Sequence, residues 1–344
     1  MALLKNKGVS FMKNLLDKVK AWAASVPGAV KSNKVTFIVA GVVVVLAFVV
    51  GCGIGGSGKS AASEEAAAPQ LTPEQQKQAE EAAAAEAEEA AFNEALKTVK
   101  LEAGIYSIVD GSKKAEPSNE YQPTDSKMFR YRVLEDGSGL WAEYIGDAAA
   151  VYFPKAYEGL TVYEVSIGNT KNWSDRKDPL QIKMPNTVKV IHYMNKSVKA
   201  IDSIEIPSSV VSIDNEAFAG LEIKDIALPT TTKLGDSLFK NCKFTKINWV
   251  FPVIPSSTFS GNRKLATVTF TDNLKKIGSY AFNNCVELTA INGLPSTVIF
   301  ESDKDQDDCQ FKNVEKLPLA TEAQIKAIHA GNKNKHYDKE FPWH

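Results

Sequence analysis

The strongest constraint on this chain is a sequence unit that occurs four times between Ser203 and Leu288. Its copies read SIEIPSSVVSIDNEAFAGL, DIALPTTTKLGDSLFKNC, NWVFPVIPSSTFSGN and VTFTDNLKKIGSYAFNNC. Their phenylalanines follow one another by 21, 20 and 23 residues, at Phe218, Phe239, Phe259 and Phe282. A fixed period in the twenties is typical of a solenoid, because one unit cannot bury its apolar face alone and must stack on its neighbours.

Each unit begins with a strand in which apolar and polar residues alternate, so that one side faces the core. The alternation predicts that these residues point inward: Ile204, Ile206, Ile226, Leu228, Trp249, Phe251, Val268 and Phe270. A second position follows each Phe by three residues and is held by Leu221, Cys242, Asn262 and Cys285. Small or polar residues there are expected to satisfy backbone groups inside the bend.

We expect the array to start at Ala156, because AYEGLTV at residues 156–162 matches AFAGLEI at residues 217–223 in residue type. Before it, MFRYRVLEDGSGLWAEY consists of two alternating runs about Asp136-Gly137, a pattern that predicts a β-hairpin. Such a hairpin would cap the exposed end of the array.

These residues resemble BspA-like, treponemal-type leucine-rich repeats, whose units are similar to IxIPxSVxxIGxxAFxxCxxL. IEIPSSVVSIDNEAF and KKIGSYAFNNC match this unit nearly throughout, and the segment around the hairpin is similar to the family's usual lead-in. The third unit departs from it with PVIPSST, and residues 299–310 lack the Ala-Phe pair. LPLATEAQIKAI (317–328) is similar to the helix that closes such arrays.

The resemblance implies a β-rich leucine-rich-repeat solenoid and a non-enzymatic protein at the cell surface or in the periplasm. Family members are often adhesins that bind proteins or extracellular matrix. The family supplies no binding residue that can be transferred to this chain.

The N-terminal residues 1–34 contain seven lysines and one acid, Asp17. Within them, Phe11, Leu15, Val19 and Trp22 recur at helical spacing, a pattern that predicts a short basic amphipathic helix. Such a helix suits an anionic membrane surface, and a solvated cytoplasmic tail is the alternative.

Residues 35–54 are twenty in number and carry no charge, enough for a helix to cross the roughly 30 Å hydrocarbon core. The lysines before this segment predict a transmembrane signal-anchor whose N-terminus is cytoplasmic, so that the rest of the chain is extracytoplasmic. The segment ends in Val49-Val50-Gly51-Cys52, which resembles a bacterial lipobox, so lipidation of Cys52 is the alternative anchor.

A phosphate-binding loop pattern, GxxxxGKS, occurs at residues 53–60. Its flanks are a membrane-length apolar run and a flexible tether (55–72), whereas a nucleotide site needs a buried strand and a helix. Nucleotide binding is therefore the least favoured function. After the tether, Thr72 and Gln75 form a capping-box pattern that begins an Ala/Glu-rich helix over 73–100, interpreted as a solvated spacer.

The outward residues of the stacked strands form the predicted ligand face of the array. They are small and mostly polar: Ser203, Glu205, Asp225, Ala227, Asn248, Val250, Thr267 and Thr269. No aromatic cluster marks a hot spot among them, so an ordinary solvated sheet surface is the alternative. A second candidate patch consists of Trp141 and Trp173.

Four cysteines lack CxxC spacing, so a zinc site is not predicted. Cys285 and Cys309 would lie in successive coils, within range of a disulfide, and free buried thiols are the alternative. Asp303, Asp305, Asp307 and Asp308 lack the glycine and glutamate of a calcium loop, which favours a solvated acidic loop. We expect no cofactor, no metal, no catalytic residue and no nucleic-acid partner.

The predicted organisation can be given by residue ranges. It comprises a basic tail with an amphipathic helix (1–34), a transmembrane signal-anchor or lipoprotein signal (35–54), a tether (55–72), a helical spacer (73–100), a lead-in with hairpin cap (101–155), the leucine-rich-repeat array (156–316), and a C-terminal helix and tail (317–344). We expect a membrane-anchored extracytoplasmic binding protein, with a periplasmic envelope scaffold as the alternative.

Overall fold

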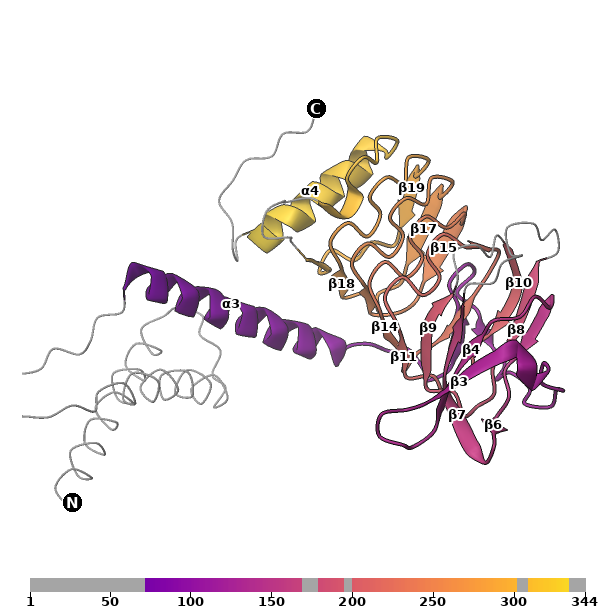
Figure 1. Cartoon of the computed structure of the whole chain (residues 1–344). Coiled ribbons are helices and arrows are strands. Elements are labelled where there is room, and N and C mark those ends of the chain that lie inside the picture. Colours follow the sequence, from indigo (N-terminus) through magenta and orange to yellow (C-terminus); the bar gives the residue numbers. More distant parts are fainter. Residues whose placement is uncertain (1–71, 169–178, 195–199, 302–308, 334–344) are drawn as a thin grey trace, which may run out of the picture. The chain divides into compact units, whose positions relative to one another are not determined.

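The computed structural model describes residues 72–168, 179–194, 200–301 and 309–333 (Figure 1). All described residues belong to one compact unit, Leu71–His344. Four predicted features therefore lie outside the described residues: the basic tail, the apolar segment with Cys52, the phosphate-loop pattern and the tether. Among the residues that are described, no helix has the length and apolarity needed to cross a membrane.

Helix α3 (Pro73–Leu96) begins as its capping box predicts. The backbone N–H of Gln75 donates to Thr72 Oγ1 at 3.3 Å, and the Thr72 N–H donates to Gln75 Oε1 at 3.0 Å. The helix ends at Leu96 rather than at residue 100. The Thr98 hydroxyl donates to the Ala95 carbonyl at 2.7 Å, so a side chain satisfies one of the last helical carbonyls as the chain turns away.

The predicted solenoid is confirmed by two stacks of short, mostly parallel strands (Figure 1). The first stack contains β5 (Ala150–Tyr152), β8 (Leu180–Lys183), β10 (Ala200–Glu205), β12 (Glu222–Ile223), β13 (Ala227–Pro229), β15 (Lys246–Trp249), β17 (Thr267–Phe270) and β19 (Ala290–Asn292). The second contains β3 (Phe129–Val133), β4 (Leu140–Tyr144), β7 (Leu160–Ile167), β9 (Val190–Met194), β11 (Ser212–Ile213), β14 (Lys233–Leu234), β16 (Val253–Ile254), β18 (Lys276–Ile277) and β20 (Ile299–Phe300).

A column of stacked phenylalanine rings fills the core between these strands. Successive ring centroids of Phe218, Phe239, Phe259, Phe282 and Phe311 are 5.7, 5.8, 5.4 and 5.3 Å apart. Their planes are within 17° of parallel, and the rings are buried. Each coil therefore contributes one ring, as the period predicts.

The residue two positions after each Phe has a left-handed backbone. Its φ is 77° at Gly220, 59° at Asn241, 74° at Gly261, 60° at Asn284 and 59° at Asn313. Glycine tolerates this conformation because it has no Cβ, and asparagine tolerates it better than most residues. This explains why the repeat carries only Gly or Asn there.

In three coils the next residue closes the bend with its side chain, as expected, whereas Leu221 and Val314 hold this position with apolar side chains. Cys242 Sγ donates to the Phe218 carbonyl at 3.2 Å, and Cys285 Sγ donates to the Phe259 carbonyl at 3.2 Å. Asn262 Nδ2 donates to the Phe239 and Phe259 carbonyls at 2.8 and 2.9 Å. Each of these side chains thus satisfies a core carbonyl of the preceding coil.

Cys309 does not occupy the same place in its coil as Cys285, as the Cys285–Cys309 disulfide would require. The acidic segment 302–308, which lies outside the described residues, lengthens the last unit, so that 29 residues separate Phe282 from Phe311. The counterpart of Cys285 is then Val314, three residues after Phe311, and Cys309 precedes the ring. Cys242, Cys285 and Cys309 are free thiols, all of them buried.

We expect Cys242 and Cys285 to resist alkylation until the array unfolds. Burial raises the pKa of each thiol to about 12, so very little reactive thiolate exists at pH 8. Peptide mass spectrometry after iodoacetamide treatment, with and without denaturant, measures this. Labelling of these peptides at equal rates in both conditions would contradict the prediction.

The third unit shows a register shift relative to the sequence-based alignment. All eight residues predicted to point inward are buried. However, β15 pairs with β17 as Ile247 to Val268 and Trp249 to Phe270, so the outward residues of this strand are Lys246 and Asn248. Val250 follows the strand and is buried, so its assignment to the outward face was wrong. The short PVIPSST segment makes this coil two residues shorter than the next, because β16 starts four residues after Trp249 and β18 six after Phe270.

Both ends of the array are covered. The predicted hairpin is present as antiparallel β3 and β4, and β4 continues in parallel with β7. The segment from Ala156 does not open the array as expected, because β6 (Ala156–Tyr157) folds back on β7 and Tyr157 stacks on Tyr131 at 4.0 Å. At the other end, α4 (Leu319–Lys333) buries Ile325 and Ile328.

Candidate functional site

A segment before the array, residues 100–124, runs along the strand ends of the first stack and contacts one coil after another. We call it the strap. The Lys100 N–H donates to Asn273 Oδ1 at 2.9 Å, and the Thr230 N–H donates to the Gly104 carbonyl at 2.9 Å. Glu116 and Asn119 accept from the backbone N–H groups of Ser208 and Asn186 at 2.9 and 2.7 Å, and the Thr124 N–H donates to the Tyr152 carbonyl at 3.0 Å. The strap thereby ties five coils together.

The strap also inserts a strand into the first stack. Strand β1 (Ile105–Ser107) pairs antiparallel with β13 and with β2 (Lys113–Lys114). Beyond β1, the Ile108 N–H donates to the Ile226 carbonyl at 3.0 Å, and the Ile108 carbonyl accepts from the Asn248 N–H at 2.8 Å. The parallel strands of the first stack thus fall into two sheets, β12-β10-β8-β5 and β15-β17-β19. Ile108, fully buried, bonds to the coil on each side of the inserted strand.

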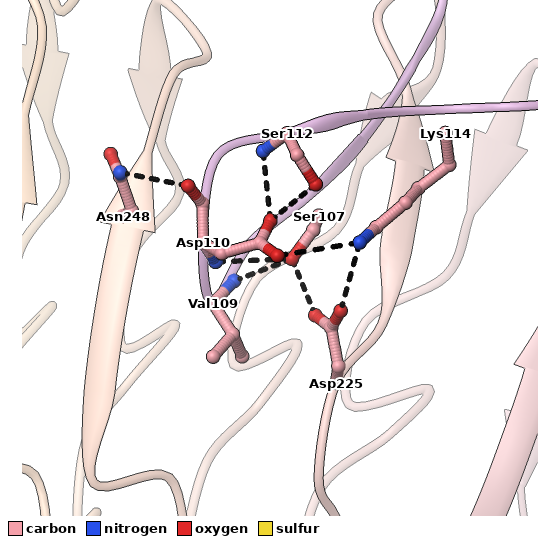
Figure 2. A network of polar contacts seen from close by, with 7 residues as sticks. All are labelled: Ser107, Val109, Asp110, Ser112, Lys114, Asp225 and Asn248. Carbon is pink, nitrogen blue, oxygen red and sulfur yellow. Dashed lines mark hydrogen bonds and ion pairs between the residues drawn. The ribbon is translucent and has the colours of Figure 1, made fainter.

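A polar network holds the turn between β1 and β2 against the array (Figure 2). Ser107 Oγ donates to Asp225 Oδ1 at 2.6 Å and accepts from the N–H groups of Val109 and Asp110 at 3.1 Å each. Asn248 Nδ2 donates to the Asp110 carbonyl at 3.1 Å. Lys114 Nζ lies 3.4 Å from Asp110 and 3.8 Å from Asp225. These contacts fix one edge of the strand face.

A groove of about 290 Å³ lies between this edge and the outward face of β10 and β13. Its lining combines isoleucines with charged side chains from both the array and the strap. The lining residues are Ile105, Lys114, Ala115, Pro117, Asp202, Ser203, Ile204, Glu205, Ile206, Lys224, Asp225, Ile226 and Ala227. One of its acids, Glu205, pairs with Lys183 at 3.2 Å.

A second cluster lies on the second stack and is built around Trp141. Arg132 lies over the indole face at 4.8 Å, and the His192 ring centroid is 4.4 Å away. The indole N–H donates to Ser166 Oγ at 2.9 Å. We call this cluster the Trp141 patch, and its members are Arg130, Arg132, Trp141, Glu143, Glu164, Ser166, His192, Tyr193 and Asp214.

Comparison with protein families identifies the repeats. The model for the BspA type leucine-rich repeat region matches residues 188–311 with six copies. Residues 188–311 are a BspA-type leucine-rich repeat region. The resemblance seen in the four most regular units therefore extends over the coils that contain the groove.

Three solved structures of leucine-rich repeat proteins match part of this chain. The T. pallidum leucine-rich repeat protein is 24% identical, with a TM-score of 0.45, over 60% of this chain and 96% of that one. A leucine-rich repeat protein from Bacteroides ovatus is 22% identical, with a TM-score of 0.39, over 55% and 56%. A leucine-rich cell surface protein from Faecalibacterium prausnitzii is 13% identical, with a TM-score of 0.22, over 53% and 79%. A search of curated proteins found no match.

The predicted ligand face of the BspA-type array is divided by the strap. Ser203, Glu205, Asp225 and Ala227 line the groove. Asn248 lies beside the strap and bonds to it, while Thr267 and Thr269 lie beyond the inserted strand on the sheet of β15, β17 and β19. Asn292 Nδ2 donates to Thr269 Oγ1 at 3.5 Å in that part. The groove therefore belongs to the first half of the face.

Sequence reasoning missed the strap residues of the groove and most of the Trp141 patch. Lys114, Ala115 and Pro117 lie in a stretch of turn formers without periodicity, which carries no signal of where it docks. Trp141 was identified as an aromatic candidate, and its predicted neighbour Trp173 lies outside the described residues. A signal for the patch exists in the alternation of Arg130, Arg132, Trp141 and Glu143, which places all four on one face of the hairpin.

Metal and nucleotide chemistry gain no support from the described part of the chain. No group of three or more His, Cys, Asp or Glu side chains there could hold a metal ion. The acidic cluster at Asp303, Asp305, Asp307 and Asp308 lies outside the described residues.

We expect the strap to loosen at low pH because of Asp110. Hydrogen bonds from the Ser112 hydroxyl and N–H lower the pKa of Asp110 well below its ordinary value of 3.8. A lowered carboxyl pKa stabilises the fold fully above the unfolded value, and this stabilisation is lost as pH falls through the folded value. Thermal midpoints of wild type and Asp110→Asn should therefore differ at pH 6 and converge as pH falls below 3.8. A difference that stays constant down to pH 2 would contradict this.

Proposed function

We propose that this protein is a non-enzymatic binding protein that holds a protein or extracellular-matrix ligand in the groove between the strap and strands β10 and β13. The observation that carries the proposal is the convergence of four residues of the predicted ligand face, Ser203, Glu205, Asp225 and Ala227, on one hollow. The BspA-type repeats support protein binding in general, since stacked coils provide extended surfaces for a partner.

The groove combines two properties that favour binding. It is a hollow of about 290 Å³ whose isoleucines are buried beneath it, and Glu205, Asp225 and Lys114 provide charges at fixed places around it. The network around Ser107 and Asp225 holds the strap edge before a ligand arrives. A surface that is already ordered loses less conformational entropy on binding, so more of the contact energy appears as affinity.

We further propose that the binding unit is anchored to a membrane and is extracytoplasmic. The uncharged residues 35–54 and the preceding lysines support a signal-anchor, and Cys52 supports a lipid anchor as the alternative. Helix α3 would act as a spacer of about 36 Å, given its 24 residues and a rise of about 1.5 Å per residue. An adhesin-like role at the cell surface is our preferred function, with a periplasmic scaffold as the alternative.

Ligand binding can be tested with one matched pair of substitutions. A photoreactive amino acid at Ser203 lies in the groove, whereas one at Thr267 lies on the same strand face outside it. On intact cells of the native host, exposed to collagen and fibronectin as matrix probes, we expect crosslinks to a defined protein from Ser203 only. Ser203→Arg should abolish saturable binding of that protein to the purified chain, and Thr267→Arg should leave it unchanged. Equal binding by both variants would reject the groove.

The location can be tested separately. External protease should digest residues 100–344 on intact cells, whereas protection until the outer layer is opened would support the periplasmic alternative. Radiolabelled palmitate fed to wild type and Cys52→Ala distinguishes the two anchors. Absence of label on the wild type would exclude the lipid anchor.

A further inference from the structure

We propose that the Trp141 patch is an interface at which two copies of this chain pair about a two-fold axis. The patch crosses β3, β4, β7, β9 and β11 and is separate from the groove, since no residue belongs to both. Arg132, Trp141 and Glu164 lie opposite one another across β3, β4 and β7. His192 and Asp214 lie two residues beyond Val190 and Ser212, the residues that continue this line on β9 and β11, so the five side chains form a diagonal row. When a second copy of the row is turned end to end, the positive end of each copy lies opposite the negative end of the other. Trp141 then lies opposite His192.

The β3 end of the row is positive. Arg130 Nη1 and Arg132 Nη2 lie 3.0 and 3.5 Å from Glu143 Oε2, so two guanidinium groups share one carboxylate. The Glu143 side chain is 7% exposed, whereas those of Arg130 and Arg132 are 55% and 49% exposed. This end therefore presents a surplus positive charge, and its compensating carboxylate is buried.

The β11 end of the row is negative. His192 Nδ1 lies 2.6 Å from Asp214 Oδ2, and His192 Nε2 lies 2.7 Å from Glu164 Oε2. Two carboxylates surround one imidazole, so the local charge is negative whether or not the ring is protonated. The Asp214 side chain is 47% exposed and can accept a donor from a partner.

Aromatic side chains between the two ends are held in place from several sides. Trp141 is fixed by the Arg132, His192 and Ser166 contacts described above. The Tyr193 hydroxyl donates to Glu143 Oε1 at 2.7 Å while 45% of the residue stays exposed. Trp, Tyr and Arg dominate the energetics of protein interfaces, and side chains that are already ordered lose little entropy on binding.

A two-fold axis in the plane of the interface, passing over Glu164 and inclined to β7 to suit the diagonal row, brings the ends together. In such an isologous contact, residue i meets residue j and residue j meets residue i. Arg132 then faces Asp214 of the second copy, and Trp141 faces His192. The only like pair, Glu164 at the axis, has its carboxylate bonded to His192 at 2.7 Å. Each dimer would contain two Arg–Asp pairs and two Trp–His contacts, which is why a second copy fits this row.

The oligomeric state of the full chain, measured by sedimentation in density-matched detergent, tests this inference. We expect a concentration-dependent dimer. Arg132→Gln and Asp214→Asn should each raise its dissociation constant about threefold to tenfold, since each removes two exposed charge pairs per dimer. Trp141→Ala should raise it by about 30-fold or more. Raising the salt to 0.5 M should weaken the wild-type dimer, because the pairs lie at the rim.

Matched controls are exposed residues of the same kind outside the patch. Arg263→Gln and Asp272→Asn should leave the dissociation constant unchanged. Thermal midpoints report whether each variant is folded, and Arg132→Gln keeps Arg130 as a partner for Glu143. A monomer at all concentrations, or a dimer that the three patch substitutions and salt leave intact, would overturn the inference. Neither result depends on whether the groove binds a ligand.

Discussion

Replacement of Phe259 by alanine is expected to lower the free energy of unfolding by about 3–5 kcal/mol. The Phe259 ring is fully buried and stacks between Phe239 and Phe282, with centroid distances of 5.8 and 5.4 Å. Trp249 meets it edge-on at 5.5 Å. The substitution leaves a cavity in the middle of the aromatic column, where neighbouring coils are held by their own backbone bonds and cannot collapse into it.

Equilibrium denaturation in urea measures this loss. Phe92→Ala is the matched control, because Phe92 lies on α3 and its ring contacts Lys276 Nζ at 5.8 Å rather than the core. We expect the control to change stability by about 0.5 kcal/mol or less. Phe259→Leu should fall between the two. A loss below about 1 kcal/mol for Phe259→Ala would show that the column contributes little to stability.

Ile108→Asp is expected to release the strap and to destabilise the array by about 3 kcal/mol or more. Ile108 is fully buried, and its backbone bonds to Ile226 on one side and to Asn248 on the other. An aspartate there would place an unpaired carboxylate in the core, so the strap must leave for the charge to reach water. The backbone groups of both neighbouring coils would then lose their partner.

Hydrogen exchange of the Ile226 to Asn248 region and limited proteolysis of residues 100–124 should both detect this release. Ala115→Asp is the control, since it adds the same charge at an exposed position of the strap. We expect that variant to retain wild-type stability and protease resistance. If Ile108→Asp also behaves as wild type, the inserted strand is not part of the stabilising core.

The coils were predictable because their constraints are local and repeated. Phenylalanine at Phe218, Phe239, Phe259 and Phe282 must fill the same place in each coil, and Gly or Asn must follow at the left-handed position. These requirements appear in the sequence as a period. The capping box at Thr72 and the hairpin around Gly137 were predictable for the same reason, since each is decided by a few neighbouring residues.

The strap was not predictable because its partners are far away in the sequence. Ile108 bonds to residues 118 and 140 positions later, and no local pattern near Ile108 encodes that distance. Val250 was wrongly assigned to the outward face because the third coil is two residues shorter than the next. An alignment of the repeats by their prolines does not show at which positions these two residues are missing. Cys309 was misplaced by an insertion in the same way. Four residues of the array wall of the groove, Ser203, Glu205, Asp225 and Ala227, could thus be named from the sequence, while its strap wall could not.

The attachment of the strap also determines how the protein would carry tension. The chain leaves α3 and first bonds to Asn273, Thr230 and strand β13, in the middle of the array rather than at its hairpin end. A pull through α3 therefore enters the array beside the groove. A ligand held against β10 and β13 would be connected to α3 by a short route across β13 and β1. The coils from β3 to β8 would keep the groove in shape without lying in the line of force, so a sustained pull could be borne without unwinding them.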